Sequence, residues 1–312
     1  MPSTTPTEVL EAEASPQERS SLFDKLVSPE VTVWLVVVIW AGNFAVLKTA
    51  YSQLAPLPFT AIRFTLATAM MMALLYWREG DCRFPAGSFG KFLWLGLVGN
   101  TLYQVCFATG LAQTTSANSS LIVTTTPAVV AIAGGFIGLE RINRNTIFGL
   151  ALAMAGIGVV MSNRGVALSS QTLRGDLLVL VSVFGWTAYV LGMRSVGEGI
   201  SSLRATTLTL MTGAPGLALI GLPGLLKVDW TQIGGATVFG VFYSSALALV
   251  VCYLLYNRNV RLLGGVKTTI YGCVIPVIAA LIAWPVLGER PTLPQAIGAI
   301  LIVAGVLITR RK

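Results

Sequence analysis

The chain has 312 residues, of which 54% are hydrophobic and only 11% are Asp, Glu, Lys or Arg. Soluble domains carry about 25% charged residues, so this composition excludes an ordinary soluble fold and indicates a protein whose solvent is the lipid bilayer. The formal charge of +8 fits basic residues that flank membrane helices. No basic cluster typical of nucleic-acid binding is present, so nucleic acid is excluded as a partner.

The sequence contains no histidine, and its four cysteines form no CxxC pair. The commonest metal ligand and the commonest general base are therefore missing, and neither a metal nor a cofactor is expected. The acidic residues lie in predicted tails, loops and helix ends, without the paired aspartates, the zinc motif or the nucleophile–base pair of membrane enzymes. A membrane-embedded enzyme or an assembly subunit is therefore the disfavoured alternative.

Residues 1–30 are polar and lack the apolar core of a signal peptide, so they are predicted to form a disordered cytoplasmic tail. Ten apolar stretches of membrane-spanning length follow, and these must be helices because lipid offers no partner to unpaired backbone groups. The predicted spans are 31–50, 57–77, 89–111, 117–139, 146–162, 175–195, 203–226, 232–256, 264–287 and 292–309. With the N-terminus in the cytoplasm, 15 of the 21 Lys and Arg residues fall on the cytoplasmic side, so both termini are predicted to be cytoplasmic.

The two halves of the chain repeat one another. Trp40 and Lys48 correspond to Trp186 and Arg194 at an offset of 146 residues. At an offset of 149, Pro127, Glu140, Arg141, Gly149, Ala155 and Gly156 correspond to Pro276, Glu289, Arg290, Gly298, Ala304 and Gly305. Five spans are an odd number, so the second half (166–312) enters the membrane from the side opposite to the first (31–165). The predicted fold is an all-α membrane protein of ten transmembrane helices, in which two inverted five-helix repeats form a basket around a central cavity.

The same residues carry a resemblance to a known family. The pattern Trp40-x-x-Asn43-Phe44-x-x-x-Lys48, with the Pro, Glu-Arg and Gly positions of both halves, resembles the EamA-type members of the drug/metabolite transporter (DMT) superfamily. Within this group the chain is most similar to the YddG-type bacterial exporters of aromatic and other amino acids. The resemblance covers about residues 31–309 and implies an inner-membrane exporter, with spans one, three, four, six, eight and nine around the substrate path.

Neutral polar and aromatic side chains inside the spans are the candidate substrate-binding residues. Trp40 and Asn43 share one face of the first span by helical spacing, and Trp186 with Tyr189 occupies the matching face of the sixth. The full candidate set is Trp40, Asn43, Asn100, Tyr103, Gln104, Trp186, Tyr189, Tyr243, Ser244 and Tyr271. Hydrogen bonding between helices is the alternative role for each of them.

Charged residues and prolines suggest roles at the edges of the path. Lys48 and Arg63 are expected either to extend their charges to the membrane surface or to meet a substrate carboxylate in an outer vestibule. Glu140-Arg141 and Glu289-Arg290 are interpreted as helix-end caps or as latches of a gate. The mid-span prolines Pro127 and Pro276 predict kinks, which act either as hinges or as static bends.

The expected substrates are amino acids with aromatic or other neutral side chains, because aromatic walls with scattered amides suit a zwitterion. A phosphate or a nucleotide sugar would need several buried Arg or Lys residues. No acidic residue falls in the middle of a span, which favours a facilitator over a proton-driven pump. Export of drugs or nucleotide-sugar-like metabolites, and proton coupling through Asp176, are the alternatives. Membrane lipid is the other expected partner, and the expected oligomeric state is a monomer.

Overall fold

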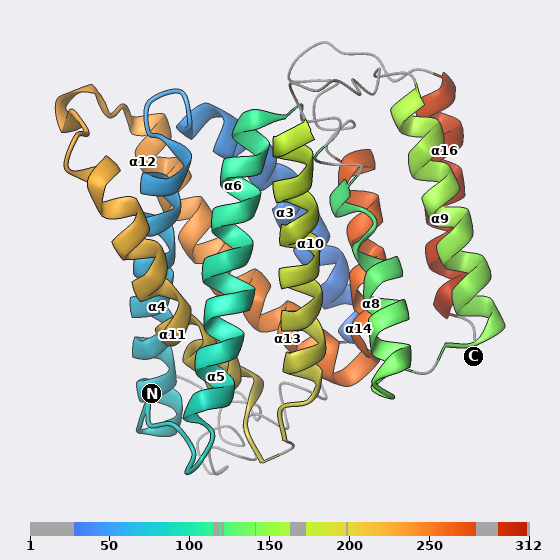
Figure 1. Ribbon diagram of the computed structural model, residues 1–312, viewed down its shortest axis with the longest axis horizontal. Coiled ribbons are helices and arrows are strands. Elements are labelled where there is room, and N and C mark those ends of the chain that lie inside the picture. Colours follow the sequence, from blue (N-terminus) through green and yellow to red (C-terminus); the bar gives the residue numbers. More distant parts are fainter. Residues whose placement is uncertain are drawn as a thin grey trace, which may run out of the picture.

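The computed structural model describes residues 28–114, 119, 122–140, 142–162, 173–197, 199–278 and 293–310. These ranges are almost entirely helical and form ten helices in one bundle (Figure 1). The first half contains α3 (Pro29–Ala50), α4 (Pro56–Glu79), α5 (Phe89–Gly96) continued by the π-helix η1 (Leu97–Leu102) and α6 (Tyr103–Gln113), α8 (Thr126–Phe136) and α9 (Arg144–Ser162). The second half contains α10 (Leu173–Arg194), α11 (Ser202–Leu225), the 3-10 turn η2 (Trp230–Gln232), α12 (Gly235–Phe242) continued by the π-helix η3 (Tyr243–Val251) and α13 (Cys252–Leu263), α14 (Gly265–Thr269) continued by the 3-10 helix η4 (Ile270–Val274), and α16 (Leu293–Arg310).

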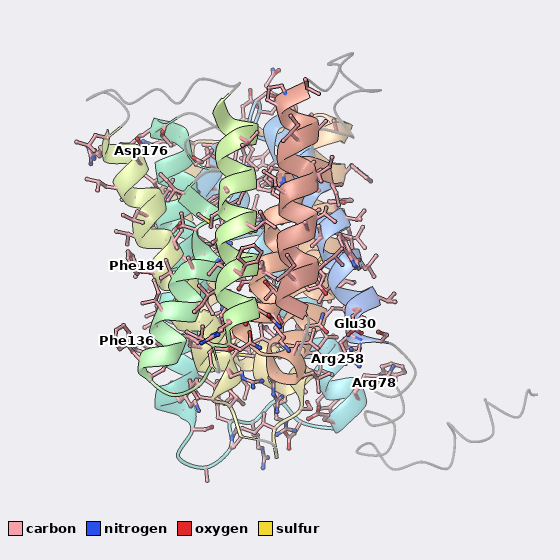
Figure 2. All side chains as sticks on the ribbon, turned by 90° about the vertical axis from the view of Figure 1, so that its right-hand side faces the viewer. Glu30, Arg78, Phe136, Asp176, Phe184 and Arg258 are labelled. Atoms are coloured by element: carbon pink, nitrogen blue, oxygen red, sulfur yellow. The ribbon has the colours of Figure 1, made fainter. Side chains whose placement is uncertain are left out.

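The outer surface of the bundle is suited to lipid. Among the described residues, five helices are long and apolar enough to cross a membrane: Pro56–Glu79, Phe89–Gln113, Leu173–Arg194, Ser202–Leu225 and Gly235–Leu263. Large apolar side chains stay exposed on the outside, such as Trp77 at 75% and Phe136 at 89%. Figure 2 shows Phe136 and Phe184 pointing away from the bundle, where water would disfavour them and lipid would not.

Helix ends lie close to where the sequence predicts them. Ser28 accepts a hydrogen bond from the backbone N–H of Glu30, and Pro29 stands in the first turn of α3, where its missing N–H costs nothing. Gly80 ends α4 in the left-handed conformation, with φ at 79°. Most predicted spans therefore agree with the helices within two residues. The predicted tail falls largely on residues 1–27, which lie outside the described residues.

The eighth predicted span ends too early. It was predicted to end at residue 256, whereas the helix α13 continues to Leu263. The prediction placed 257–263 in a basic loop, yet Asn257, Arg258 and Asn259 are 0%, 4% and 0% exposed. Their polar groups face other helices. The Asn257 side-chain amide donates to the Tyr189 hydroxyl over 2.7 Å, and Thr32 donates to Asn259 Oδ1 over 3.0 Å. Hydropathy falls at these residues although the helix does not end.

The two prolines expected to kink continuous helices stand at the start of helical segments instead. Pro127 occupies the first turn of α8, directly after a turn at Thr124 and Thr125. Pro276 follows the 3-10 helix η4 by two residues, at the equivalent place in the second half. A proline in a first turn removes no helical hydrogen bond, so the irregular backbone precedes each proline rather than surrounding it.

The contacts between α9 and α16 follow the sequence repeat. These helices lie side by side (Figure 1), and glycines allow their backbones to touch. A Cβ atom on Gly149 would lie 2.5 Å from the Gly305 carbonyl oxygen, and one on Gly156 would lie 2.7 Å from that of Gly298. Since Gly149 corresponds to Gly298 and Gly156 to Gly305, the two contacts are exchanged by the repeat, as a two-fold axis requires.

The third and eighth helices run in opposite directions along the bundle. Figure 1 places α5 low and α6 high, whereas α12 lies high and α13 low. Basic residues mark one end of the bundle, which we call the basic end and define by Arg78, Arg194, Arg204 and Arg261. Figure 2 shows Arg78 near this end and Asp176 at the opposite end.

Candidate functional site

A cavity of about 170 Å³ lies among helices of both halves. This is roughly ten times the space that one buried water needs, so the cavity has room for a small solute. Six of its walls come from the spans that the family resemblance places around the path: α3, α6, the start of α8, α10, the η3–α13 helix and the α14–η4 helix. Helix α4, which the resemblance does not include, also contributes to the lining. The polar and aromatic lining residues are Trp40, Asn43, Arg63, Tyr103, Gln104, Phe107, Thr124, Thr126, Ser182, Trp186, Tyr253, Tyr256, Asn259, Thr268 and Thr269.

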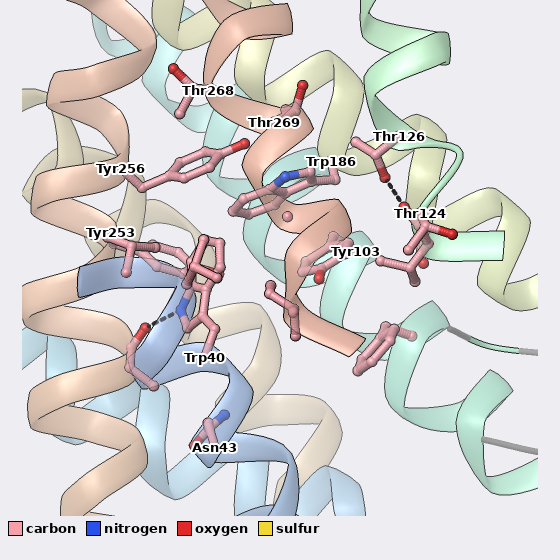
Figure 3. A pocket seen from close by; sticks show the side chains of 18 of the residues that line it. Trp40, Asn43, Tyr103, Thr124, Thr126, Trp186, Tyr253, Tyr256, Thr268 and Thr269 are labelled. Carbon is pink, nitrogen blue, oxygen red and sulfur yellow. Dashed lines mark hydrogen bonds between the residues drawn. The ribbon is translucent and has the colours of Figure 1, made fainter. Parts of the chain in front are cut away.

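Trp186 on α10 is the centre of the aromatic wall. Its ring centroid lies 4.9 Å from that of Tyr103, 5.4 Å from that of Tyr256 and 5.7 Å from that of Tyr253. Trp40 on α3 approaches Trp186 edge-on at 6.2 Å, so the two tryptophans that the repeat equates do converge. Figure 3 shows Trp186 between Trp40, Tyr253 and Tyr256 on one side and Tyr103 on the other. Such offset and edge-on pairs stabilise each other, and all five of these residues line the cavity.

Hydrogen bonds inside the cluster fix the orientation of the polar lining groups. The Trp40 indole N–H donates to the carbonyl of Ala248 in η3 over 3.0 Å. Ser244 donates to Asn43 Oδ1 over 2.7 Å, which directs the two N–H donors of the Asn43 amide to other partners. The lining hydroxyls of Thr268 and Thr269 each donate to a carbonyl one turn earlier in their own helix. These two threonines therefore contribute more to the helix than to recognition.

One of the two expectations for Arg63 on α4, that it extends its charge to the membrane surface, is wrong. Arg63 is only 5% exposed and lines the cavity. Its Nη2 donates to Gln104 Oε1 over 2.8 Å, and its guanidinium lies 5.4 Å from the centre of the Phe64 ring. Arg63 is the one charged side chain among the lining residues that the structure describes. The position of the Lys48 side chain lies outside the described residues.

Half of the predicted site residues line the cavity and half stand behind it. Trp40, Asn43, Tyr103, Gln104 and Trp186 belong to the lining. The other five are absent from it: Asn100, Tyr189, Tyr243, Ser244 and Tyr271. Each of these five side chains forms a hydrogen bond or a ring contact with another residue.

The contacts of these five residues explain their position. Asn100 donates to the backbone carbonyl of Thr209 over 3.0 Å, and Tyr243 donates to that of Ile39 over 3.1 Å. Tyr189 stacks on Trp186 at 5.1 Å, and Tyr271 meets Trp34 edge-on at 5.5 Å. Ser244 donates a hydrogen bond to the lining residue Asn43. These five residues lie behind the lining residues. Contacts between helices are the alternative role that the sequence left open for each of them.

Tyr253 and Tyr256 on α13 are site residues that the sequence reasoning missed. Both contact Trp40 and Trp186, with ring centroids 5.1 Å apart for Tyr256 and Trp40. They are spaced i, i+3 in an apolar span, which is the same signal that identified Trp40 and Asn43. The predicted helix end at Tyr256 obscured that signal.

Glu140 connects three segments at the basic end. Its carboxylate accepts a hydrogen bond from the backbone N–H of Gly265 over 2.5 Å and lies 3.9 Å from Arg194 Nε. Arg194 in turn donates to the carbonyl of Arg261 over 2.7 Å. The segment after α8, the end of α10 and the α13–α14 junction are thereby joined, an arrangement that fits a helix-end cap as well as a latch. Arg141, Glu289 and Arg290 lie outside the described residues.

A second charged cluster joins α4 to α11 at the same end. Arg204 lies 2.8 Å from both Glu79 Oε2 and Asp81 Oδ1. The backbone N–H of Arg83 and the guanidinium of Arg204 hold the pKa of Asp81 below its usual value. These ion pairs join α11 to the end of α4 and to the segment after it.

Comparisons with known proteins agree with this architecture. A model of the EamA-like transporter family matches the chain twice, over residues 28–162 and 173–311, so the two halves are repeats. The chain is 30% identical over 284 residues to an uncharacterized transporter of Archaeoglobus fulgidus, covering 89% of this chain and 96% of that protein. It is 29% identical over 282 residues to the uncharacterized transporter YyaM of Bacillus subtilis, covering 86% and 89%. A solved crystal structure, 19% identical and matching with a TM-score of 0.73 over 90% of this chain and 96% of that one, shares its fold.

Proposed function

The chain belongs to the EamA-like transporter family, and from this premise we propose that it exports amino acids and related small metabolites across the inner membrane. The proposed substrates carry aromatic or other neutral side chains. The proposed orientation places both termini and the basic end in the cytoplasm, because Lys and Arg gather on the cytoplasmic side of membrane proteins. In this interpretation the protein is a transporter of solutes and catalyses no covalent chemistry.

The observation that carries the proposal is the aromatic cavity at the meeting of the two halves. Rings of Trp40, Trp186 and Tyr253 offer apolar faces, whereas Asn43 and Gln104 offer amide groups. This combination suits a solute with an apolar side chain and a polar backbone end. A single Arg, Arg63, among the described lining residues is too few for a diphosphate, so a nucleotide sugar is disfavoured.

Alternating access is the proposed mechanism, with ten transmembrane helices in two inverted five-helix repeats. The opposite directions of the third and eighth helices and the exchanged glycine contacts of α9 and α16 support it. The Glu140 connection supports a state in which the cytoplasmic side is closed. Pro127 and Pro276, each beside irregular backbone, are the proposed hinges.

The proposed transport is not driven by protons. No Asp or Glu occurs among the cavity-lining residues that the structure describes. Asp176, the residue considered for coupling, accepts a hydrogen bond from Thr114 at the end opposite to the basic end (Figure 2). A carboxylate that exchanges protons with substrate would have to stand beside the cavity.

Counterflow into proteoliposomes tests the proposal. Purified protein is reconstituted with internal unlabelled amino acid, and uptake of radiolabelled phenylalanine, threonine or methionine is measured against empty liposomes. We expect uptake of at least one of the three without a pH gradient. Failure of all three would refute the amino-acid proposal, and uptake that requires an imposed pH gradient would refute the uncoupled mechanism. Uptake of a nucleotide sugar instead would support the rival substrate class.

A further inference from the structure

Arg63 carries a buried charge that the described part of the protein does not neutralise. Ion pairs form elsewhere among the described residues, such as Arg194–Glu140, Arg204–Glu79 and Arg204–Asp81, but none of these pairs includes Arg63. Its Nη2 meets the neutral Gln104, and its Nε has no hydrogen-bond partner. A guanidinium that is 5% exposed therefore faces the cavity with unused donors.

Such a group is costly to bury without an anion. The penalty for a desolvated ion is several kcal/mol, and a neutral amide or an aromatic face offsets only part of it. Gln104 and the rings of Phe59 and Phe64 supply this partial compensation, at 2.8 Å, 6.0 Å and 5.4 Å. The remaining compensation must come from whatever occupies the cavity. Arg binds carboxylates with two parallel N–H···O bonds, which matches its free donors.

We propose that Arg63 binds the carboxylate of the substrate, held in place by Gln104, while the rings around Trp186 hold its apolar part. The inference rests on the proposed function and names the recognised group. Gln104 is a positioning residue, because its Oε1 accepts from Arg63 and its side chain is also a hydrogen-bonding partner of Tyr253. It thereby links the cation to the aromatic wall.

The lining has no matching site for an ammonium group among the described residues, since it contains no Asp or Glu. An ammonium would meet ring faces and carbonyl oxygens, which bind it more weakly than a carboxylate does. The substrate class is therefore an aromatic or apolar monocarboxylate, in which the carboxylate is required and the amino group is dispensable.

Calorimetric titration of the purified protein with three probes tests this. Phenylalanine has both charged groups, 3-phenylpropionate lacks the ammonium, and phenylalaninamide lacks the carboxylate. We expect the first two to bind, and phenylalaninamide to bind at least about tenfold more weakly, because one charge-assisted hydrogen-bond pair is lost. Equal binding of phenylalaninamide and phenylalanine would overturn the inference.

Variants of Arg63 test whether this residue causes the stronger binding of the two carboxylates. Arg63→Gln should weaken binding of both carboxylates about tenfold or more and leave phenylalaninamide unchanged, which also shows that the variant is folded. Arg63→Lys should retain part of the affinity, since it keeps the charge without the planar fork. Arg78→Gln is the matched control, because Arg78 also lies over a ring of α4, 4.9 Å from the centre of Trp77, but on the exposed surface.

The outcomes separate this inference from the proposed function. Carboxylates that bind Arg63→Gln as tightly as the natural protein would refute the role of Arg63 and leave amino-acid export standing. If none of the three probes binds the natural protein, the proposed substrate class is wrong, and the carboxylate site is refuted with it.

Discussion

Trp186 is the residue on which the cavity depends most, because it contacts Trp40, Tyr103, Tyr253 and Tyr256 at once. Trp186→Ala should weaken phenylalanine binding by at least about tenfold, and removal of a buried Trp should lower stability by about 3–5 kcal/mol. Trp186→Phe keeps a ring and should retain most of the stability with part of the binding. Binding is measured by calorimetry and stability by thermal unfolding in detergent.

The control for this prediction is Trp77→Ala, because Trp77 is 75% exposed on the outer face of α4. It should change neither measurement appreciably. Phenylalanine binding that survives Trp186→Phe and Trp186→Ala unchanged would move the substrate site away from this cavity.

Five of the ten predicted substrate-binding residues line the cavity, and for three of the other five the reason lies in the backbone. Asn100 falls within the π-helix η1, and Tyr243 and Ser244 fall within η3. A π-helix has more residues per turn than an α-helix, so a wheel drawn with 3.6 residues per turn assigns the wrong face on one side of it. Tyr103 and Gln104 begin the regular helix α6, and both line the cavity.

At the scale of elements, the Glu140 connection should control access from the basic end. Glu140→Ala removes the acceptor for Gly265 N–H and the anion near Arg194. Loss of a charged acceptor costs about 1.5–3 kcal/mol, and 1.4 kcal/mol already changes an equilibrium tenfold. The cavity should therefore open toward the basic end about tenfold more often.

Maleimide labelling of Cys273 measures this opening, because Cys273 lines the cavity and is 1% exposed. The other cysteines, Cys82, Cys106 and Cys252, are replaced by alanine, and the reagent is added from the side of the basic end. Asp81→Ala is the control, since Asp81 lies at the same end with its side chain 47% exposed. If Glu140→Ala labels no faster than this control, Glu140 only caps the neighbouring backbone.

The length of the η3–α13 helix shows what hydropathy cannot reveal about an element. Asn257, Arg258 and Asn259 read as a loop because they are polar. They continue the helix because neighbouring helices supply partners, such as Tyr189 and Thr206 for Asn257. A polar residue is costly in lipid but not against a hydrogen-bonding protein surface, and single-sequence hydropathy does not distinguish the two.

At the scale of the whole molecule, the repeat was the most informative signal in the sequence. Equal offsets of Pro, Glu-Arg and Gly residues indicated two related halves, and the family model matches each half separately. The cavity was less predictable, because the approach of Arg63 to Gln104 depends on how α4 packs against α6. No periodicity within one helix encodes that distance between two helices.

The glycine contacts between α9 and α16 give the repeat a measurable consequence. A Cβ on Gly156 would lie 2.7 Å from the Gly298 oxygen and 2.8 Å from the Ile302 nitrogen, and these are backbone atoms that cannot move alone. Gly156→Ala should therefore push the helices apart and lower stability by about 1–3 kcal/mol. A Cβ on Gly158, in the same helix, would meet no atom within 4 Å, so Gly158→Ala should be neutral or gain about 0.5–1 kcal/mol.

Gly305 is the repeat equivalent of Gly156, and its Cβ would lie 2.7 Å from the Ala153 nitrogen. If the two halves pack about a two-fold axis, Gly305→Ala should lower the thermal unfolding temperature as much as Gly156→Ala does. The three variants are compared by thermal unfolding in the same detergent. A loss for Gly156→Ala with none for Gly305→Ala would contradict symmetric packing, because exchanged contacts must respond alike.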